Sequence, residues 1–337
     1  MTTVTAVIVS FGAQPWIERC VDAVLASTGV DVDVVIVDNG DTSGAIKRLA
    51  GRCRVGVLSP GRNTGFAAGC NAGVAAASGE IVALINPDVI VQPDTLASLA
   101  AVASEPVVGL ATSSVRLADA PALMNSAGNP VHYLGLAWAG GHGETADRYD
   151  KRRTVASASG ACCAVRRSLW MSLGGFEAAY FAYHEDVEMS LRCWQRGLEV
   201  VYAPDAVAIH HYEFARNKLK SELLERNRWL TLLTVYSSRT LWLLAPALAG
   251  MELAVLADAA VRGWLPAKVA GYRWLLRNRA LVSRRRAQLQ AERSRPDRDL
   301  VPVLAARFEP TNVDAPPGLP MLNAVLAAYW AVVRRFV

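Results

Sequence analysis

Two short acidic motifs follow apolar, β-branched runs in the first hundred residues. Asp38-Asn39-Gly40 follows the run 32–37, and Asn86-Pro87-Asp88 follows the run 81–85. If these runs are parallel strands, both motifs lie at the carboxyl ends, where α/β sheets bind ligands. Asp38 could then accept hydrogen bonds from a base or ribose. Asn86 and Asp88 could face one metal ion, because a divalent ion that binds a diphosphate takes only one or two protein carboxylates as ligands. Either motif alone is also typical of an ordinary turn, but their joint placement favours a ligand site.

The segment 62–73, RNTGFAAGCNAG, has the residue types of an anion site. Arg62 beside a helix N-terminus would suit a diphosphate. It is not a P-loop, because no Gly-Lys-Ser/Thr follows, and it does not match the dinucleotide fingerprint. The alternative is a strand-to-helix turn whose glycines allow close helix–sheet packing.

A third group is Tyr183-His184-Glu185-Asp186, at the expected start of a helix. Adjacent helical residues point about 100° apart, so one carboxylate can face a cleft while the other caps or pairs. Plain capping of the helix is the alternative. His210, after a short extended run, could join carboxylates as a metal ligand.

The elements that would position these residues alternate between strands and helices, which predicts a largely parallel sheet covered on both faces. We expect strands over 4–9, 32–37, 55–58, 81–85 and 157–165, extended pieces at 200–202 and 207–210, and helices over 16–27, 43–50, 65–77, 94–104 and 185–196. The glycine-rich stretch 113–153 is expected to be mainly loops.

In this order, the motifs DNG, RNTGFAAGCNAG, INPD, SGACCAVRR, GGF, YHEDVEMSLR and VYAPDAVAIHH resemble glycosyltransferase family 2, especially its bacterial rhamnosyltransferases. The resemblance covers about residues 3–212. It implies the GT-A fold, which binds a nucleotide-diphosphate sugar, and inversion at the anomeric carbon. Two positions depart from the family pattern: Asn86 replaces an acid of the metal-binding D-x-D, and His184 replaces an uncharged residue.

The resemblance also assigns roles by position. Asp38, with Asn39, matches the contact to the nucleotide, and Arg62, Asn63 and Gly65 match the diphosphate side. Asn86 and Asp88 match the metal motif, with Asp88 its remaining carboxylate, and His210 is similar to a further ligand of Mg²⁺ or Mn²⁺. Asp186 matches the general base, which removes the proton of the attacking hydroxyl, and Glu185 is its neighbour.

The implied reaction transfers a sugar from a nucleotide donor, such as dTDP-rhamnose or a UDP-sugar, to a polyprenyl-diphosphate-linked or glycan acceptor. The alternatives are a galactofuranosyl or other hexosyl transferase, and a catalytically silent scaffold that only binds nucleotide sugars. A third alternative is a structural protein that associates with the membrane through its C-terminal helices only. The survival of Asp88, Asp186 and His210 argues against a silent protein.

The chain is expected to divide into a catalytic domain (1–215), a basic helical region (216–308), and a Pro-rich linker with a last apolar helix (309–337). Net charge is +5, but residues 262–298 hold eleven basic and two acidic residues, so the rest is mildly acidic. This is unlike a nucleic-acid binder. Arg284-Arg285-Arg286 and nearby apolar helices predict attachment to an anionic membrane surface, or else pairing with the acidic body. A helix near 240–257 is expected to lie in the membrane plane or be buried rather than to span.

Cysteine spacing and the N-terminus predict where the protein works. None of the six cysteines has C-x-x-C spacing, which favours reduced, buried thiols. The N-terminus carries no secretory pattern. We expect a cytoplasmic protein, peripheral at the inner face of the cell membrane.

Overall fold

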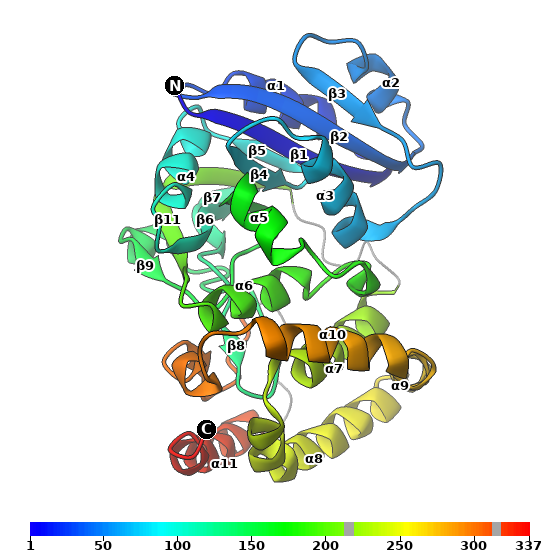
Figure 1. The fold of residues 1–337 in the computed structure, drawn as a ribbon, viewed down its shortest axis with the longest axis vertical. Helices are drawn as coiled ribbons and strands as arrows, with labels where there is room; N and C mark the ends of the chain where they lie inside the picture. Colours follow the sequence, from blue (N-terminus) through cyan, green and yellow to red (C-terminus); the bar gives the residue numbers. More distant parts are fainter. Residues whose placement is uncertain (212–218, 312–317) are drawn as a thin grey trace.

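The computed structural model describes residues 1–211, 219–311 and 318–337. A broad sheet with helices on both faces forms the N-terminal part, and a group of helices closes one end of it (Figure 1). The predicted boundary at 215/216 and most of the predicted Pro-rich linker lie outside the described residues.

Ten described strands form the main sheet. Their bounds are β1 Thr3–Gly12, β2 Asp31–Asp41, β3 Val55–Leu58, β4 Ile81–Ile85, β5 Val89–Val91, β6 Val108–Leu117, β7 Ala120–Ser126, β9 Arg153–Thr154, β10 Cys162–Arg166 and β11 Glu199–His210. The order is β3-β2-β1-β4-β10-β6-β11-β5, with β7 on β6 and β9 on β11. The first four strands run parallel, as predicted, whereas β10 runs antiparallel between β4 and β6.

Helices cover both faces because the strand residues alternate between two cores. On β1, Val4, Ala6 and Ile8 point into one core, and Val7 and Val9 into the other. Helices on the first face are α1 Ile17–Leu25, α2 Ala45–Leu49 and α4 Thr95–Ala103; those on the second are α3 Gly65–Ala76, α5 Arg167–Leu173 and α6 Glu185–Gln195. Burial on both faces explains the continuous apolar runs of the sequence.

Three stretches differ from the expectation. The two extended pieces before His210 are one strand, β11, with a register shift between Ala203 and Val207. The strand expected over 157–165 is confined to β10, because Ser157 makes an isolated bridge to Asn129 instead. The stretch 113–153 holds the end of β6, the strands β7 and β8 (Val131–His132), and a short 3-10 helix, Ala146–Tyr149, besides loops.

The C-terminal region packs on the sheet domain through a third core. It contains α7 Lys220–Val235, α8 Ser238–Val261, α9 Leu265–Arg277, α10 Arg279–Glu292, α11 Leu319–Val333 and the short strand β12 Leu304–Ala305, which pairs with β8 Val131–His132. In that core the indole of Trp330 stacks on Tyr133, with ring centroids 4.6 Å apart. Val187 and Leu191 of α6 belong to the same core. The helices of the C-terminal region are therefore joined to the helix that begins with Glu185.

A buried ionic network joins α7, α8 and α9. Arg228 lies 2.9 Å from Glu225 and 2.6 Å from Glu252, and Lys268 pairs with both carboxylates. Arg228 and Lys268 are each only 1% exposed. Two positive and two negative groups balance, which is the condition under which buried charges are tolerated.

Candidate active site

The carboxyl ends of β4 and β11 bring Asp88 and His210 together. The turn 86–88 leads from β4 into β5, and β5 pairs antiparallel with β11, so that Val89 lies opposite His210. The Asp88 Oδ1 atom lies 3.2 Å from His210 Nε2. That oxygen is buried, and it makes no hydrogen bond to any described residue. A carboxylate oxygen and an imidazole nitrogen facing one another are the kind of ligands that a Mn²⁺ or Mg²⁺ ion takes.

The predicted donor side is built around the start of α3. Asn39, only 1% exposed, donates from Nδ2 to the Gly65 carbonyl at 2.9 Å and accepts at Oδ1 from the Thr64 hydroxyl. Asn63 Oδ1 accepts from the Gly65 N–H. These bonds fix the turn before α3. The structure thus shows Asn39 and Asn63 holding the turn, and a direct contact of either with a donor stays a prediction.

The glycines of this segment serve two purposes. A Cβ on Gly69 or Gly73 would lie 2.7 or 2.3 Å from Val9 or Val7, so these two permit close packing of α3 on β1. Gly65 has φ +85°, and a Cβ there would lie 2.5 Å from the Phe181 carbonyl. The Ala67 N–H donates to the same carbonyl. The turn predicted for the diphosphate is therefore in contact with the loop that precedes the acidic pair.

Asp38 and Arg62 lie apart from the acidic pair. Asp38 Oδ1 accepts from the backbone N–H groups of Gly40 and Asp41, at 2.9 and 2.7 Å, and the side chain is partly exposed. Arg62 is exposed. Neither lines the cleft that holds the acidic pair. The structure therefore does not bring these two predicted donor contacts into the same cleft as the acidic pair.

The acidic pair begins α6 after an unusual loop. Phe181, Tyr183 and His184 all have positive φ, of 64°, 70° and 69°. Two neighbours from α7 hold this loop: Arg226 donates to the Tyr180 carbonyl, and Asn227 Nδ2 lies within 2.9 Å of the carbonyls of Tyr180, Ala182 and Tyr183. The strained turn is therefore stabilised by the C-terminal region.

The two carboxylates of the pair have different surroundings. Asp186 Oδ2 accepts from the Gly160 N–H at 3.0 Å, and Oδ1 from the Val187 N–H at 2.8 Å. Burial raises the pKa of Asp186, while these N–H groups act in the opposite direction. Burial, with the charge of Asp186, raises the pKa of Glu185 well above its ordinary value, and Glu185 Oε2 has no hydrogen-bond partner among the described residues. The environment favours Asp186 as the ionised member and Glu185 as the protonated one.

One cleft of about 510 Å³ brings several of these residues together. Asn86, Glu185, Asp186 and His210 line it, and α7 contributes part of its wall. It also contains residues for which the sequence analysis proposed no role, among them Asn125, Asn129, Trp138, His142, Lys220, Arg228 and Phe308. Their segments carry no recognisable motif. His184 lies there too, and burial lowers its pKa to about 4, so the imidazole is neutral at physiological pH.

Family and fold together define a glycosyltransferase of the GT-A type. Residues 2–231 match the family model described as glycosyltransferase like family 2, and the chain belongs to this family. The protein is a glycosyltransferase, as the sequence motifs predicted.

Among curated proteins, the chain is similar to the N-acetylglucosaminyl-diphospho-decaprenol L-rhamnosyltransferase of Mycobacterium tuberculosis. The two are 29% identical over 274 residues, covering 73% of this chain and 88% of the relative. The O-antigen biosynthesis protein RfbC of Myxococcus xanthus is 28% identical over 72% of this chain, but only 19% of that protein is covered.

Solved structures support the fold. GalNAc-T7 with UDP, GalNAc and Mn²⁺ matches with a TM-score of 0.59 at 16% identity, over 71% of this chain and 49% of that one. A mannosyltransferase from Pyrobaculum calidifontis, in complex with GDP-Man and Mn²⁺, matches with a TM-score of 0.52 at 20% identity, over 86% and 85%. The GT-A fold prediction is confirmed.

Proposed function

We propose that this glycosyltransferase moves a sugar, with rhamnose favoured, from a nucleotide-diphosphate donor to a polyprenyl-diphosphate-linked or growing glycan acceptor of the cell envelope. The observation that carries the proposal is the cleft in which the Glu185–Asp186 pair and His210 share one space, with Asp88 against His210. The similarity to the mycobacterial rhamnosyltransferase, over most of both chains, supports the choice of sugar and acceptor.

Asp186 would act as the general base. It is held in one orientation by the Gly160 N–H, and it lines the cleft. An acceptor hydroxyl against its carboxylate would lose its proton as the oxygen attacks the anomeric carbon. Such a single displacement by the acceptor inverts the anomeric configuration. Arg62, near the predicted diphosphate side, would stabilise charge on the leaving group.

The residues present fit a divalent metal held jointly with the donor. Asp88 offers a buried oxygen without a hydrogen bond, and His210 Nε2 faces it. Among the residues that the structure describes, no cluster of three or more His, Cys, Asp or Glu could hold a metal alone. Diphosphate oxygens and water would therefore complete the coordination. A bound Mg²⁺ or Mn²⁺ would supply positive charge at the leaving diphosphate.

Membrane attachment is the second part of the proposal, and it rests on the outer surfaces of α8 and α11. From Trp242 to Val261, every exposed residue of α8 is uncharged, and Trp242 and Leu253 are 80% and 70% exposed. On α11 the exposed residues from Met321 to Val332 are also uncharged. Tyr329 of α11 donates to the Leu243 carbonyl of α8, so the two helices lie side by side (Figure 1). Such a surface is typical of membrane contact.

We favour contact in the membrane plane over a span. Helix α8 is long and apolar enough to cross a membrane by length and composition alone. However, its Glu252 pairs inward with Arg228 and Lys268, which attaches one side of α8 to the rest of the protein. We place this surface at the cytoplasmic face of the cell membrane, where nucleotide sugars are available.

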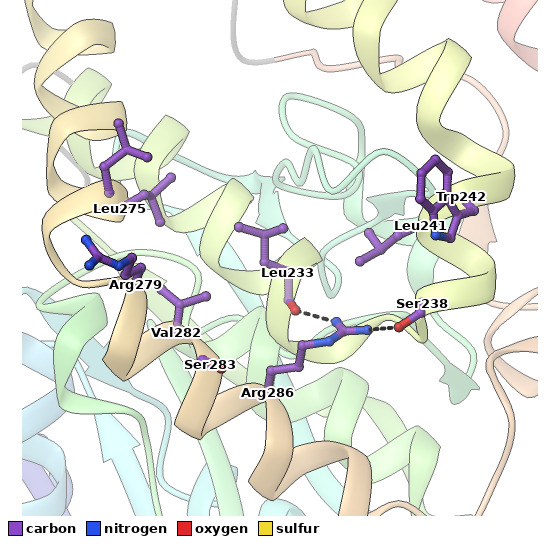
Figure 2. Close-up of a pocket in the computed structure, with 10 residues that line it drawn as sticks. Leu233, Ser238, Leu241, Trp242, Leu275, Arg279, Val282, Ser283 and Arg286 are labelled. Atoms are coloured by element: carbon purple, nitrogen blue, oxygen red, sulfur yellow. Dashed lines mark hydrogen bonds between the residues drawn. The ribbon is translucent and has the colours of Figure 1, made fainter.

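A groove of about 540 Å³ continues the apolar surface between α8 and the α9–α10 corner. Figure 2 shows Leu241 and Trp242 on one side and Leu275 and Val282 on the other. Arg286 turns inward there, donating to the Leu233 carbonyl and the Ser238 hydroxyl. The arginine cluster 284–286 is therefore not an open basic patch, and the apolar surface is the better basis for membrane contact.

The activity test offers purified protein each candidate donor with N-acetylglucosaminyl-diphospho-polyprenol and Mn²⁺ or Mg²⁺. We expect sugar transfer from dTDP-rhamnose, with product of inverted anomeric configuration by NMR. Transfer only from a UDP-hexose or UDP-galactofuranose would support the alternative donor. Donor binding without any transfer, across acceptors, would favour the silent scaffold.

A further inference from the structure

Asn125, on strand β7, lies against the imidazole of His210. The Asn125 Oδ1 atom is 2.9 Å from His210 Nδ1. Both residues are buried, at 6% and 4% exposure, although they are 85 positions apart in the chain. Asn125 reaches His210 because β7 pairs with β6, and β6 is also the neighbour of β11.

A second histidine lies beside the amide of Asn125. The Asn125 Nδ2 atom lies 3.4 Å from His142 Nδ1, and the same His142 nitrogen lies 3.3 Å from the backbone carbonyl oxygen of Asn125, so it can accept from the amide or donate to that carbonyl, but not both. With the NH₂ group facing His142, the carbonyl oxygen of the amide faces His210. An amide oxygen only accepts hydrogen bonds, so His210 Nδ1 must be the donor.

This hydrogen bond decides which nitrogen of His210 can bind a metal. With one proton, on Nδ1, the ring carries its lone pair at Nε2, the atom that lies 3.2 Å from Asp88 Oδ1. Two electron-pair donors then face one another across a gap where Asp88 Oδ1 makes no hydrogen bond. Outer-shell partners of this kind fix the tautomer and ring orientation of metal-binding histidines.

We propose that Asn125 is a positioning residue for the metal site, holding His210 in the tautomer and orientation in which Nε2 and Asp88 together bind the divalent ion. The inference rests on the metal site of the proposed function. Asn125 would act through His210 rather than as a ligand of the ion.

The experiment measures Mn²⁺ binding to the full chain by EPR titration, in the presence of dTDP or UDP. We expect Asn125→Ala to weaken Mn²⁺ binding by about 10- to 100-fold, the usual effect of losing an outer-shell partner. Asn125→Asp keeps an acceptor oxygen and should remain within a few-fold of wild type. Pulsed EPR should show ¹⁴N coupling from a bound imidazole in wild type, and loss or change of it in Asn125→Ala and in His210→Ala.

Ser126→Ala is the matched control, because Ser126 lies next in the chain, lines the same cleft and bonds to Asn129 instead of His210. It should leave both the Mn²⁺ affinity and the ¹⁴N coupling unchanged. Mn²⁺ affinity within twofold of wild type in folded Asn125→Ala would overturn the inference, as would an Asn125→Asp variant as weak as Asn125→Ala. If the wild-type protein binds no Mn²⁺, both the metal site and the role of Asn125 are wrong. If that protein still transfers sugar without a metal, the proposed reaction remains valid.

Discussion

Arg285 of α10 forms a buried ion pair with Glu188 of α6, at 2.6 Å, in which Glu188 is fully buried and Arg285 is 6% exposed. Glu188 also pairs with Arg192 one turn further along α6. The C-terminal region thus supplies half of the positive charge around a buried carboxylate that lies close to Asp186 on the same helix. The two regions therefore share a buried ion pair.

Removing Arg285 should destabilise the whole protein. For Arg285→Met we expect a loss of about 3 kcal/mol in unfolding free energy, because a buried charge loses one of its partners. Chemical denaturation monitored by circular dichroism measures it. Arg284→Ala, at an exposed neighbouring position, should change stability by less than about 0.5 kcal/mol. A folded, donor-binding fragment lacking residues 216–337 would contradict this view of a single cooperative unit.

Asp186→Asn should lower turnover by at least about 100-fold, the usual scale for losing a general base. The amide keeps the shape of the side chain and an oxygen to accept from Gly160, so donor affinity should stay near that of wild type. Steady-state kinetics and calorimetry of donor binding give the two quantities. If Glu185→Gln shows the large loss of turnover while Asp186→Asn does not, the roles within the pair are reversed.

Glu185→Gln should stabilise the protein at alkaline pH. The folded pKa of Glu185 is raised above its ordinary value of 4.5, so the native state holds a proton that the unfolded chain releases. Wild type therefore loses stability as the pH rises from about 4.5 through the folded pKa, by up to about 1.4 kcal/mol for each pH unit in that interval. The variant lacks this loss, so its advantage in melting temperature should be absent near pH 4 and grow toward pH 8. The exposed substitution Glu80→Gln should show no such trend.

Gly65→Ala should disrupt the contact between the start of α3 and the loop before α6. The new methyl group would meet the Phe181 carbonyl, and the backbone at φ +85° disfavours a side chain. We expect a cost of about 2–4 kcal/mol, with weaker donor binding. Gly61→Ala isolates the backbone effect, because Gly61 has φ +75° and open space around its Cβ position. Equal losses in the two variants would argue against the Phe181 contact.

Charged substitutions on the α8–α11 surface should weaken membrane binding. Leu253→Asp combined with Val325→Asp should lower partition onto anionic liposomes by at least about 10-fold, since two exposed apolar groups lose their burial in lipid. Flotation at low and high salt measures it. Met171→Asp, on the exposed side of α5 in the sheet domain, is the control. If salt abolishes liposome binding while the double substitution leaves it unchanged, attachment depends on the arginines alone and not on this apolar surface.

The parallel part of the sheet could be predicted from the sequence because β1, β2 and β4 are largely buried on both faces. β3 and β4 have the predicted bounds, since each is a short apolar run between turns. β7 was not predicted, because the run APALMNS shows no alternation and contains Pro121. The contact of its Asn125 with His210 depends on strand pairing, which periodicity does not reveal.

The buried charges of the C-terminal region could not be predicted either. Glu225, Arg228, Glu252 and Lys268 are residue types that ordinarily stay in water, and they come from three separate helices. Only the folded arrangement brings their opposite charges together. The motifs at strand ends and at the start of α6, by contrast, indicated Asp88, Asp186 and His210 because those positions depend on local sequence.

Arg226 and Asn227 donate hydrogen bonds to the loop before α6, and this limits how segments of this enzyme can be exchanged for those of another. A chimaera that replaced the helices after residue 219 to accept a different lipid carrier would also replace the side chains that hold Tyr180 and Tyr183. Only grafts carrying both an arginine and an asparagine at these two positions should yield working hybrids. The junction of such a chimaera should therefore lie within α7, after Asn227, rather than before it.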